Sequence, residues 1–203
     1  MYSIYRDTEA KYVLFVTKNG IVKKTSLEEY VNTKKKNGIG AISLREGDSL
    51  AAVALVKEEP LILISKNGYS ITFDSMEIGA TSRMTTGVKG INLAEGDEVV
   101  AVLPVRNKAD AVAIFTETGL AKKVAQTELV KQKRGGKGLM CYKPTDTSGL
   151  IAGAVMVSDE DNILIVGDKT SICIGATDIP ALGRSSNGNQ MIKSGKVIAV
   201  SKV

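Results

Sequence analysis

The stretch VLFVTKNGIVKKT at residues 13–25 decides the fold, because three further versions of it follow along the chain. These are LILISKNGYSITF (61–73), VAIFTETGLAKKV (112–124) and ILIVGDKTSICIG (163–175). Each version joins two runs rich in Val, Ile and Leu through a short polar turn, which is the pattern of a β-hairpin. The sequence therefore predicts four copies of one β-rich unit.

Two further landmarks recur in the same order in every copy. A glycine-containing segment appears as KKNGIGAISL, MTTGVKGINL, KRGGKGLMCY and SSNGNQMIKS, and we align its glycines at positions 38, 87, 135 and 188. After it come REGDSLAAVALV, AEGDEVVAVLPV, DTSGLIAGAVMV and KSGKVIAVSKV, which contain a turn and another apolar run. Shared composition alone does not place three landmarks in one order four times.

A repeat of about 50 residues with roughly four strands has the size of a propeller blade. We therefore expect an all-β, propeller-like array of four repeated four-stranded blades. Almost continuous apolar runs such as 13–16 and 61–64 predict strands that are buried on both faces between neighbouring blades. SLEEY (26–30) and QTELV (126–130) are expected to form helical turns. The expected blades are 11–57, 58–106, 107–157 and 158–203.

The composition narrows the function classes. With 43% hydrophobic and 24% charged residues among 203, the chain has the balance of a globular protein. It contains no histidine, so the commonest general base and a frequent metal ligand are missing. Cys141 and Cys173 are not at ligand spacing, and we expect both to be reduced, buried thiols. The sequence predicts a cytoplasmic protein with no membrane span, cofactor, metal or catalytic activity of its own.

The positive charge lies mainly in the first and third copies, whereas the second is acidic and the fourth is neutral. The net charge is +5 and the pI is about 9.1, which favours a polyanionic partner. Aromatic residues make up 4% and tryptophan is absent, so contacts to phosphates are expected rather than base stacking. The candidate cations outside the densest loop are Lys34, Lys35, Lys36, Arg83, Lys89, Lys122, Lys123 and Arg184.

The densest loop, KQKRGGKGL (131–139), combines four cations with three glycines. Glycines let backbone N–H groups approach phosphate oxygens closely, while Lys and Arg supply charge. In a propeller, equivalent loops lie along one rim, so the cations are expected to form a basic track. The alternative is that the glycines only make turns and the cations only keep exposed loop tips soluble.

The residues Gln132, Lys133, Arg134, Gly135, Gly136, Lys137 and Gly138 read QKRGGKG. At every position, this heptad matches the Q-(K/R)-R-G-G-(K/R)-G box of the DNA gyrase A protein family. The surrounding repeats, such as TKNGIVKKT and TTGVKGINLAEGDEVV, also resemble the C-terminal DNA-wrapping domain of that family. The resemblance covers essentially the whole chain.

The resemblance implies a β-pinwheel, in which blades exchange strands, acting as a non-catalytic module of an ATP-dependent topoisomerase. Such a module bends double-stranded DNA around a basic perimeter, and in gyrase this supports negative supercoiling. By position, the resemblance implies that residues 132–138 are the box and that Arg134 and Lys137 are its DNA-facing cations. The implied partners are DNA, the gyrase B subunit and the rest of the gyrase A polypeptide. The implied location is the nucleoid. Six blades with the box in the first are usual, so four blades with the box in the third suggest the last four blades of a longer domain.

Two alternatives stay open at this point. The A protein of topoisomerase IV has similar blades with degraded boxes, so the chain is also compatible with that relative. From another class, a propeller that binds proteins fits the acidic second copy and the neutral fourth copy. The dependence of DNA binding on salt separates this second alternative from a DNA-wrapping module.

Overall fold

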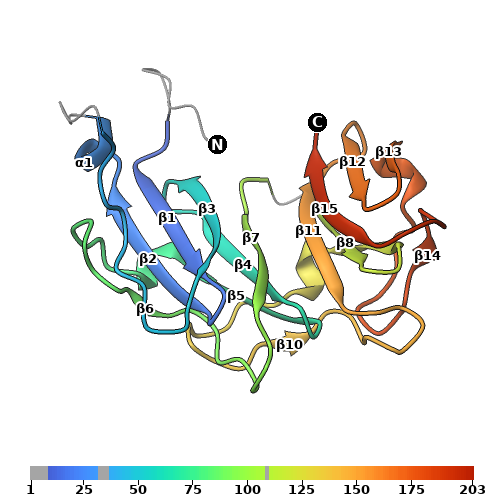
Figure 1. Ribbon diagram of the computed structural model, residues 1–203, viewed down its shortest axis with the longest axis horizontal. Coiled ribbons are helices and arrows are strands. Elements are labelled where there is room, and N and C mark those ends of the chain that lie inside the picture. The colour runs from blue at the N-terminus through green and yellow to red at the C-terminus, as the bar shows by residue number, and fades with distance from the viewer. Residues whose placement is uncertain (1–8, 32–36, 108–109) are drawn as a thin grey trace.

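The computed structural model describes residues 9–31, 37–107 and 110–203, and its four repeats form successive sheets along an arc (Figure 1). The first repeat forms β1 (Tyr12–Thr17), β2 (Ile21–Ser26), the short helix α1 (Glu28–Val31) and β3 (Leu50–Val56). The second forms β4 (Pro60–Ser65), β5 (Tyr69–Asp74), η1 (Ser75–Glu77), β6 (Val88–Lys89) and β7 (Val99–Pro104). The third forms β8 (Ala111–Thr116), β9 (Leu120–Ala125), η2 (Gln126–Glu128), β10 (Leu139–Met140) and β11 (Ile151–Val157). The fourth forms β12 (Asn162–Gly167), β13 (Ser171–Gly175), η3 (Ala176–Asp178), β14 (Asn189–Gln190) and β15 (Val197–Lys202).

Neighbouring repeats exchange a strand. The first sheet has the order β3-β1-β2-β6, and its outer strand β6 comes from the second repeat. In the same way β10 completes the second sheet beside β5, and β14 completes the third beside β9. This confirms the expected all-β pinwheel. Three of the sheets have four strands as expected, whereas the fourth has three, β13-β12-β15, within the described residues.

The hydrophobic core lies between the sheets, and this explains the uninterrupted apolar runs. Side chains alternate along a strand, so a strand between two sheets contributes to two cores. In β4, Leu61 and Leu63 pack toward the first sheet, whereas Ile62 and Ile64 pack toward the third. The expectation that these strands are buried on both faces is confirmed for β1, β4 and β8.

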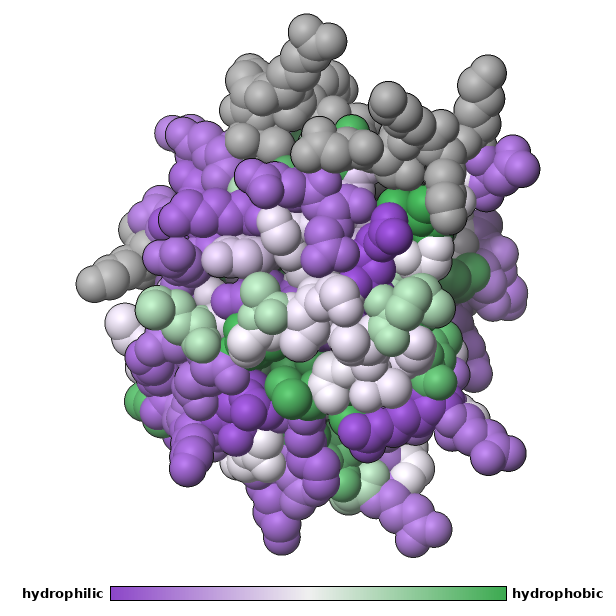
Figure 2. Space-filling model, turned by 90° about the vertical axis from the view of Figure 1, so that its left-hand side faces the viewer, coloured by the Kyte–Doolittle hydropathy of each residue, from purple (hydrophilic) through white to green (hydrophobic). Residues whose placement is uncertain are grey.

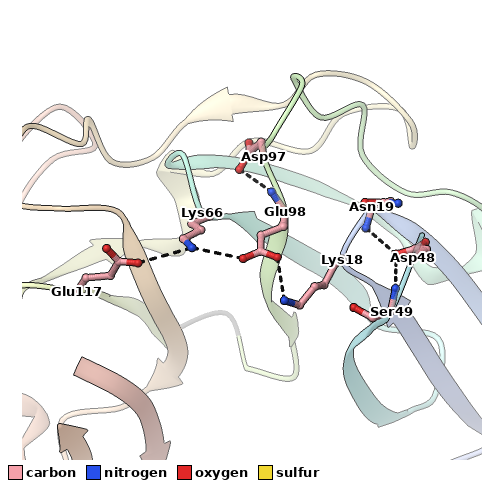
Figure 3. A network of polar contacts seen from close by, with 8 residues as sticks. All are labelled: Lys18, Asn19, Asp48, Ser49, Lys66, Asp97, Glu98 and Glu117. Carbon is pink, nitrogen blue, oxygen red and sulfur yellow. Dashed lines mark hydrogen bonds and ion pairs between the residues drawn. The ribbon is translucent and has the colours of Figure 1, made fainter. Parts of the chain in front are cut away.

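The inner strands β3, β7, β11 and β15 pack in series along the inside of the arc. At the hairpin-turn end, a chain of ion pairs joins the first three sheets (Figure 3). Lys18 and Lys66 both contact the Glu98 carboxylate, at 3.0 and 3.4 Å, and Lys66 also lies 3.6 Å from Glu117. The hydrogen bond from Lys18 is the main cause that lowers the pKa of Glu98. This chain of contacts favours one spacing of the three sheets.

The short helical turns occur where they were expected, at α1 and η2. Cys141 is a buried free thiol, and burial raises its pKa to about 11. The expectation that Cys173 is also buried is wrong, because it lies on the outward face of β13, which no further sheet covers in the described structure. No helix among the described residues is long and apolar enough to cross a membrane.

The end of the arc formed by the first sheet is seen face-on in Figure 2. Hydrophilic residues cover most of this face, and the paler and more apolar residues gather near its middle. Beneath it, Val13, Phe15 and Leu27 form a small cluster of their own. The first sheet therefore packs on both faces, one against residues of its own repeat such as Leu27, Tyr30 and Ile42 and one against the second sheet.

Candidate nucleic-acid interface

Three loops run along the outer edge of the array, and we call them the first (80–87), second (131–138) and third (181–188) rim loops. Each enters through a backbone hydrogen bond to the outermost long strand of the preceding sheet. The donors are the N–H groups of Thr81, Gln132 and Leu182, and the acceptors are the carbonyls of Lys24, Thr72 and Lys123, at 2.7–2.9 Å. Three of the four expected rim loops therefore occupy equivalent places on successive sheets, whereas Gly38 in the first copy has no described atom within 4 Å of an added Cβ.

A glycine ends each rim loop, in the left-handed region of backbone conformation. Gly87, Gly138 and Gly188 have φ angles of 85°, 76° and 81°. A Cβ atom on them would lie only 2.5, 2.3 and 2.4 Å from a carbonyl oxygen of the outer strand. The structural equivalent in the third copy is thus Gly138, which corrects the sequence alignment on Gly135. Close approach of two backbones requires a glycine here.

The second rim loop carries the free cations. Lys133 and Lys137 are exposed, and no described residue forms a hydrogen bond or an ion pair with either side chain. Lys131 is exposed as well, but it pairs with Asp74. Gly136 packs over Ile71, with 3.6 Å between an added Cβ and the Ile71 Cδ1 atom. This half of the predicted box presents charge to solvent above an apolar support.

The arginines of the three rim loops are partly buried, and those of the second and third are bonded to the backbone of the exchanged strands. The Arg134 Nε atom donates to the Glu77 carbonyl at 3.1 Å, and its Nη1 atom donates to the Lys89 carbonyl. Arg184 likewise donates to the Met140 carbonyl at 3.3 Å. In the first rim loop, the Arg83 Nε atom lies 3.9 Å from the Glu29 carboxylate.

The outer short strand of the first sheet adds one more cation. Lys89 is exposed on β6, next to the second rim loop, and its Nζ atom donates to the Asn92 side chain at 3.1 Å. Gln132, by contrast, is half-buried where the loop enters. Lys34, Lys35 and Lys36 lie outside the described residues.

Lys122 does not face outward, contrary to the expectation from sequence. It is fully buried, and its ammonium group donates to the carbonyls of Gly183, Arg184 and Ser186 at 3.0, 2.7 and 2.8 Å. The ammonium also lies 5.0 Å from the centre of the buried Tyr142 ring. Burial lowers its pKa to about 8. Lys122 therefore supports the third rim loop from beneath.

Lys123 is also placed differently from the expectation. Its side chain is 11% exposed and forms an ion pair with Asp159 at 2.9 Å. Both lysines belong to β9, in which residues 121–124 are buried, because β14 and the third rim loop cover the edge of this strand. A lysine pair in a strand is typical of an exposed edge, whereas strand exchange covers that edge here.

Sequence reasoning missed three glutamates that contact the rim loops. The carboxylates of Glu77 and Glu128 accept the backbone N–H groups of Arg134 and Arg184, at 3.0 and 3.3 Å. Glu29 has the equivalent sequence position in the first repeat, but its carboxylate lies 3.9 Å from the Arg83 side chain and its carbonyl accepts a hydrogen bond from that side chain. The signal was present, because each glutamate follows its hairpin glycine (Gly20, Gly68 or Gly119) at the same interval.

The fold and the rim together define the class of protein. It is a strand-exchanged β-propeller repeat protein whose outer loops repeat one backbone arrangement and concentrate cations in one copy. The chain belongs to the DNA gyrase A C-terminal domain family. The family described as "DNA gyrase C-terminal domain, beta-propeller" matches residues 11–57, 59–106 and 110–158.

Known gyrase A proteins are similar over nearly the whole chain. The gyrase A protein of Helicobacter pylori (strain J99) is 32% identical over 198 residues, which is 95% of this chain and 24% of that protein. The gyrase A protein of Escherichia coli (strain K12) is 35% identical over 188 residues, or 92% of this chain and 21% of that protein. The chain thus spans about a quarter of the length of these relatives.

Two solved structures have the same fold. The C-terminal domain of DNA topoisomerase IV gives a TM-score of 0.91 at 33% identity, covering 98% of this chain and 64% of that one. The DNA gyrase A C-terminal domain gives a TM-score of 0.86 at 28% identity, covering 96% of this chain and 66% of that one. The chain is therefore similar to the same module in both enzymes.

Proposed function

We propose that this chain binds and bends double-stranded DNA along its outer rim, as the non-catalytic wrapping module of a DNA gyrase A protein. The observation that carries the proposal is a pair of exposed lysines, Lys133 and Lys137, that bond to no described residue and lie on a loop whose backbone recurs on successive sheets. Ammonium groups at such positions neutralise phosphates without reading the base sequence. The cofactor-free module is proposed to work in the cytoplasm, at the nucleoid.

The placement of the rim loops supports bending. Because the sheets follow an arc, a duplex that contacts the cations of successive rim loops has to curve with it. Bending a short duplex costs on the order of 1–6 kcal/mol, which several phosphate contacts offset. The proposed contacts are Lys89, Lys131, Lys133 and Lys137, with Arg83, Arg134 and Arg184 adding charge to the rim and Gln132, Gly135, Gly136 and Gly138 shaping the loop.

The enzyme proposed to use this module is ATP-dependent gyrase. In that enzyme, the partners of the module are the B subunit and the rest of the A polypeptide. A bent segment held at a fixed angle biases which duplex crosses over the other, and this supports negative supercoiling. The intact QKRGGKG heptad and the similarity to gyrase A proteins favour gyrase. The TM-score of 0.91 with the topoisomerase IV domain favours that enzyme as the second candidate.

Filter binding of a 40-base-pair duplex over a range of salt concentrations tests the proposal. We expect the affinity to fall linearly with salt on logarithmic axes, by about 0.9 per phosphate contact. The variant Lys133→Ala/Lys137→Ala is expected to flatten the slope by roughly 1.8. Binding that ignores salt, or no binding, would contradict the proposal and favour a protein-binding propeller.

The control variant is Lys169→Ala/Lys196→Ala, which removes the same charge from exposed positions near the hairpin turn of the fourth sheet. Because these lysines lie away from the rim loops, the slope is expected to stay close to that of the unmodified protein. Equal losses in the two variants would mean that net charge alone drives binding. That result would contradict a defined rim.

A further inference from the structure

We propose that Arg134 and Arg184 are positioning residues that hold the second and third rim loops against the exchanged strand of the preceding repeat, with Glu77 and Glu128 as their partners. We call the hydrogen bonds of each arginine with its glutamate and with that strand the pin. The inference rests on the proposed function, because the loops that they position carry the proposed DNA contacts. It assigns the arginine of the QKRGGKG heptad a role in holding the loop, whereas the phosphate contacts belong to the lysines on either side of it.

The contacts of the second rim loop carry the first step. The Glu77 carboxylate accepts the Arg134 backbone N–H at 3.0 Å, which fixes the loop to the end of η1. The guanidinium group then reaches back to two carbonyls, that of Glu77 and that of Lys89. A planar guanidinium presents its N–H donors in a rigid fork, whereas the three donors of a lysine ammonium rotate at the end of a flexible stem and fit other acceptor positions.

The same arrangement recurs one repeat later. The Glu128 carboxylate accepts the Arg184 backbone N–H, and the Arg184 Nη1 atom donates to the Met140 carbonyl. Lys89 and Met140 are equivalent residues, at the ends of the exchanged strands β6 and β10. The loop around Arg184 lacks the lysines of the second rim loop, yet its arginine makes the same contact with the exchanged strand. A contact that is present in a loop without those lysines serves the loop's position and not its charge.

The pins connect the rim loops in series. Two backbone hydrogen bonds also join the second rim loop to the segment that follows β6. The Gly135 N–H donates to the Gly90 carbonyl at 2.7 Å, and the Asn92 N–H donates to the Gly136 carbonyl at 2.8 Å. Together with Arg134, these bonds fix how far Lys133 and Lys137 lie from Lys89. The spacing of cations along the proposed DNA path is therefore set by the pin.

Two variants of one residue test the pin, Glu77→Ala and Glu77→Gln. Both remove one negative charge near the proposed DNA path. Electrostatics alone therefore predicts that the two variants bind a 40-base-pair duplex with equal affinity, and more tightly than the unmodified protein does. The amide oxygen of Gln still accepts the Arg134 N–H, whereas Ala cannot. We expect Glu77→Ala to bind roughly threefold to tenfold more weakly than Glu77→Gln, with similar salt slopes. Equal affinities would overturn the pin.

Arg134→Lys gives a second measurement of the pin. If Arg134 mainly contacts phosphate, a lysine replaces it with little loss, because nonspecific phosphate contacts accept either cation. If Arg134 positions the loop, the Arg134→Lys variant bends DNA less. The reduced bending is measured as lower energy transfer between dyes attached to the two ends of the duplex. Unchanged energy transfer would overturn the pin. The matched variant Lys169→Arg, at an exposed position away from the rim loops, is expected to keep both charge and bending.

A measurement without DNA separates this inference from the proposed function. Hydrogen exchange at the amides of Arg134 and Gly135 is expected to accelerate in Glu77→Ala and to stay slow in Glu77→Gln. Glu128→Ala is expected to accelerate exchange in the third rim loop only. If the protein fails to bind DNA but shows this exchange pattern, the pin stands and the proposed function fails. If exchange is the same in all variants, the pin is wrong whatever the DNA binding.

Discussion

The second and third rim loops share a backbone but differ in charge. Both end in a left-handed glycine against the outer strand, and both carry an arginine that donates to the previous exchanged strand. At the positions of Lys133 and Lys137, however, the third rim loop has Gly183 and Asn187. The features that place the loop are therefore separable from the features proposed to bind DNA.

The two loops also rest on different supports. Beneath the second rim loop, the Ile71 side chain packs against Gly136. The equivalents of Ile71 and Gly136 are Lys122, which lies beneath the third rim loop, and Ser186, which lies in that loop. The buried Lys122 ammonium donates to three carbonyls of the loop. One loop is thus held up by apolar packing and the other by a buried charge. The same outer shape can be reached by either kind of interaction.

The largest effect is expected from the shared glycines. Gly138→Ala and Gly188→Ala each place a Cβ within 2.4 Å of a backbone carbonyl oxygen, in a backbone conformation that disfavours alanine. We expect each to lower the free energy of unfolding by about 3 to 5 kcal/mol, measured by urea denaturation. Similar losses in the two variants would confirm that the loops share one scaffold.

Gly47→Ala is the control for backbone strain. Gly47 has a φ of 72° but no atom within 4 Å of an added Cβ, so only the left-handed conformation is disturbed. Its cost is expected to be about 1 kcal/mol. If Gly138→Ala costs no more than this control, the outer strand yields to the extra atom and the close approach is not a constraint.

The next effect concerns the buried support. Lys122→Ala leaves the carbonyls of Gly183, Arg184 and Ser186 without their donor, and we expect a loss of about 2 to 3 kcal/mol in the free energy of unfolding. The double variant Lys122→Ile/Ser186→Gly copies the pair found under the second rim loop, and it is expected to recover part of that loss. A double variant that is less stable than Lys122→Ala would contradict the equivalence of the supports.

The repeat architecture could be predicted from the sequence because the landmarks recur locally. Turn residues and apolar runs lie next to one another in the chain, so the strands, the all-β fold and the buried faces of β4 followed from them. The exchange of short strands is not encoded in this way. β6 and β10 are two residues long, with no apolar pattern to mark them, and their partners lie in another repeat.

The charged side chains show where prediction from sequence stops. Lys137 was expected to be exposed and is, because a loop of glycines and cations cannot form a core. Arg134, expected to face DNA together with it, is instead half-buried and donates to backbone carbonyls. Lys122 has the same charge but is buried, because a loop from the next repeat covers its strand. Whether a lysine is free thus depends on partners 61 to 64 residues away, which local composition cannot reveal.

Adding charge to the third rim loop sharpens the comparison on the functional side. Gly183→Lys/Asn187→Lys restores the two cations of the second rim loop at exposed positions. We expect the logarithmic salt slope of duplex binding to steepen by roughly 1.8, because two further phosphates come within reach. Thr170→Lys/Ser194→Lys adds the same charge at exposed positions off the rim, and an equal slope change there would count against a rim path.

The smallest effect is the pH dependence that the buried Lys122 gives to the support of the third rim loop and that the apolar support of the second lacks. Burial lowers the pKa of Lys122 to about 8 from 10.5, so above pH 8 the unfolded chain holds a proton that the folded chain has lost. The free energy of unfolding therefore gains a contribution as the pH rises from about 8 toward 10.5, and below pH 8 the full cost of the buried charge remains.

We expect the unmodified protein to gain roughly 1 kcal/mol or less between pH 8 and 9, relative to Lys122→Ile/Ser186→Gly, in urea denaturation at each pH. Burial also lowers the pKa of Lys23 and Lys24, but both proteins contain these residues and their contributions cancel in the difference. Parallel stability curves for the two proteins would show that the three carbonyls fully compensate the burial of the ammonium. In that case the two supports differ in chemistry but not in their response to pH.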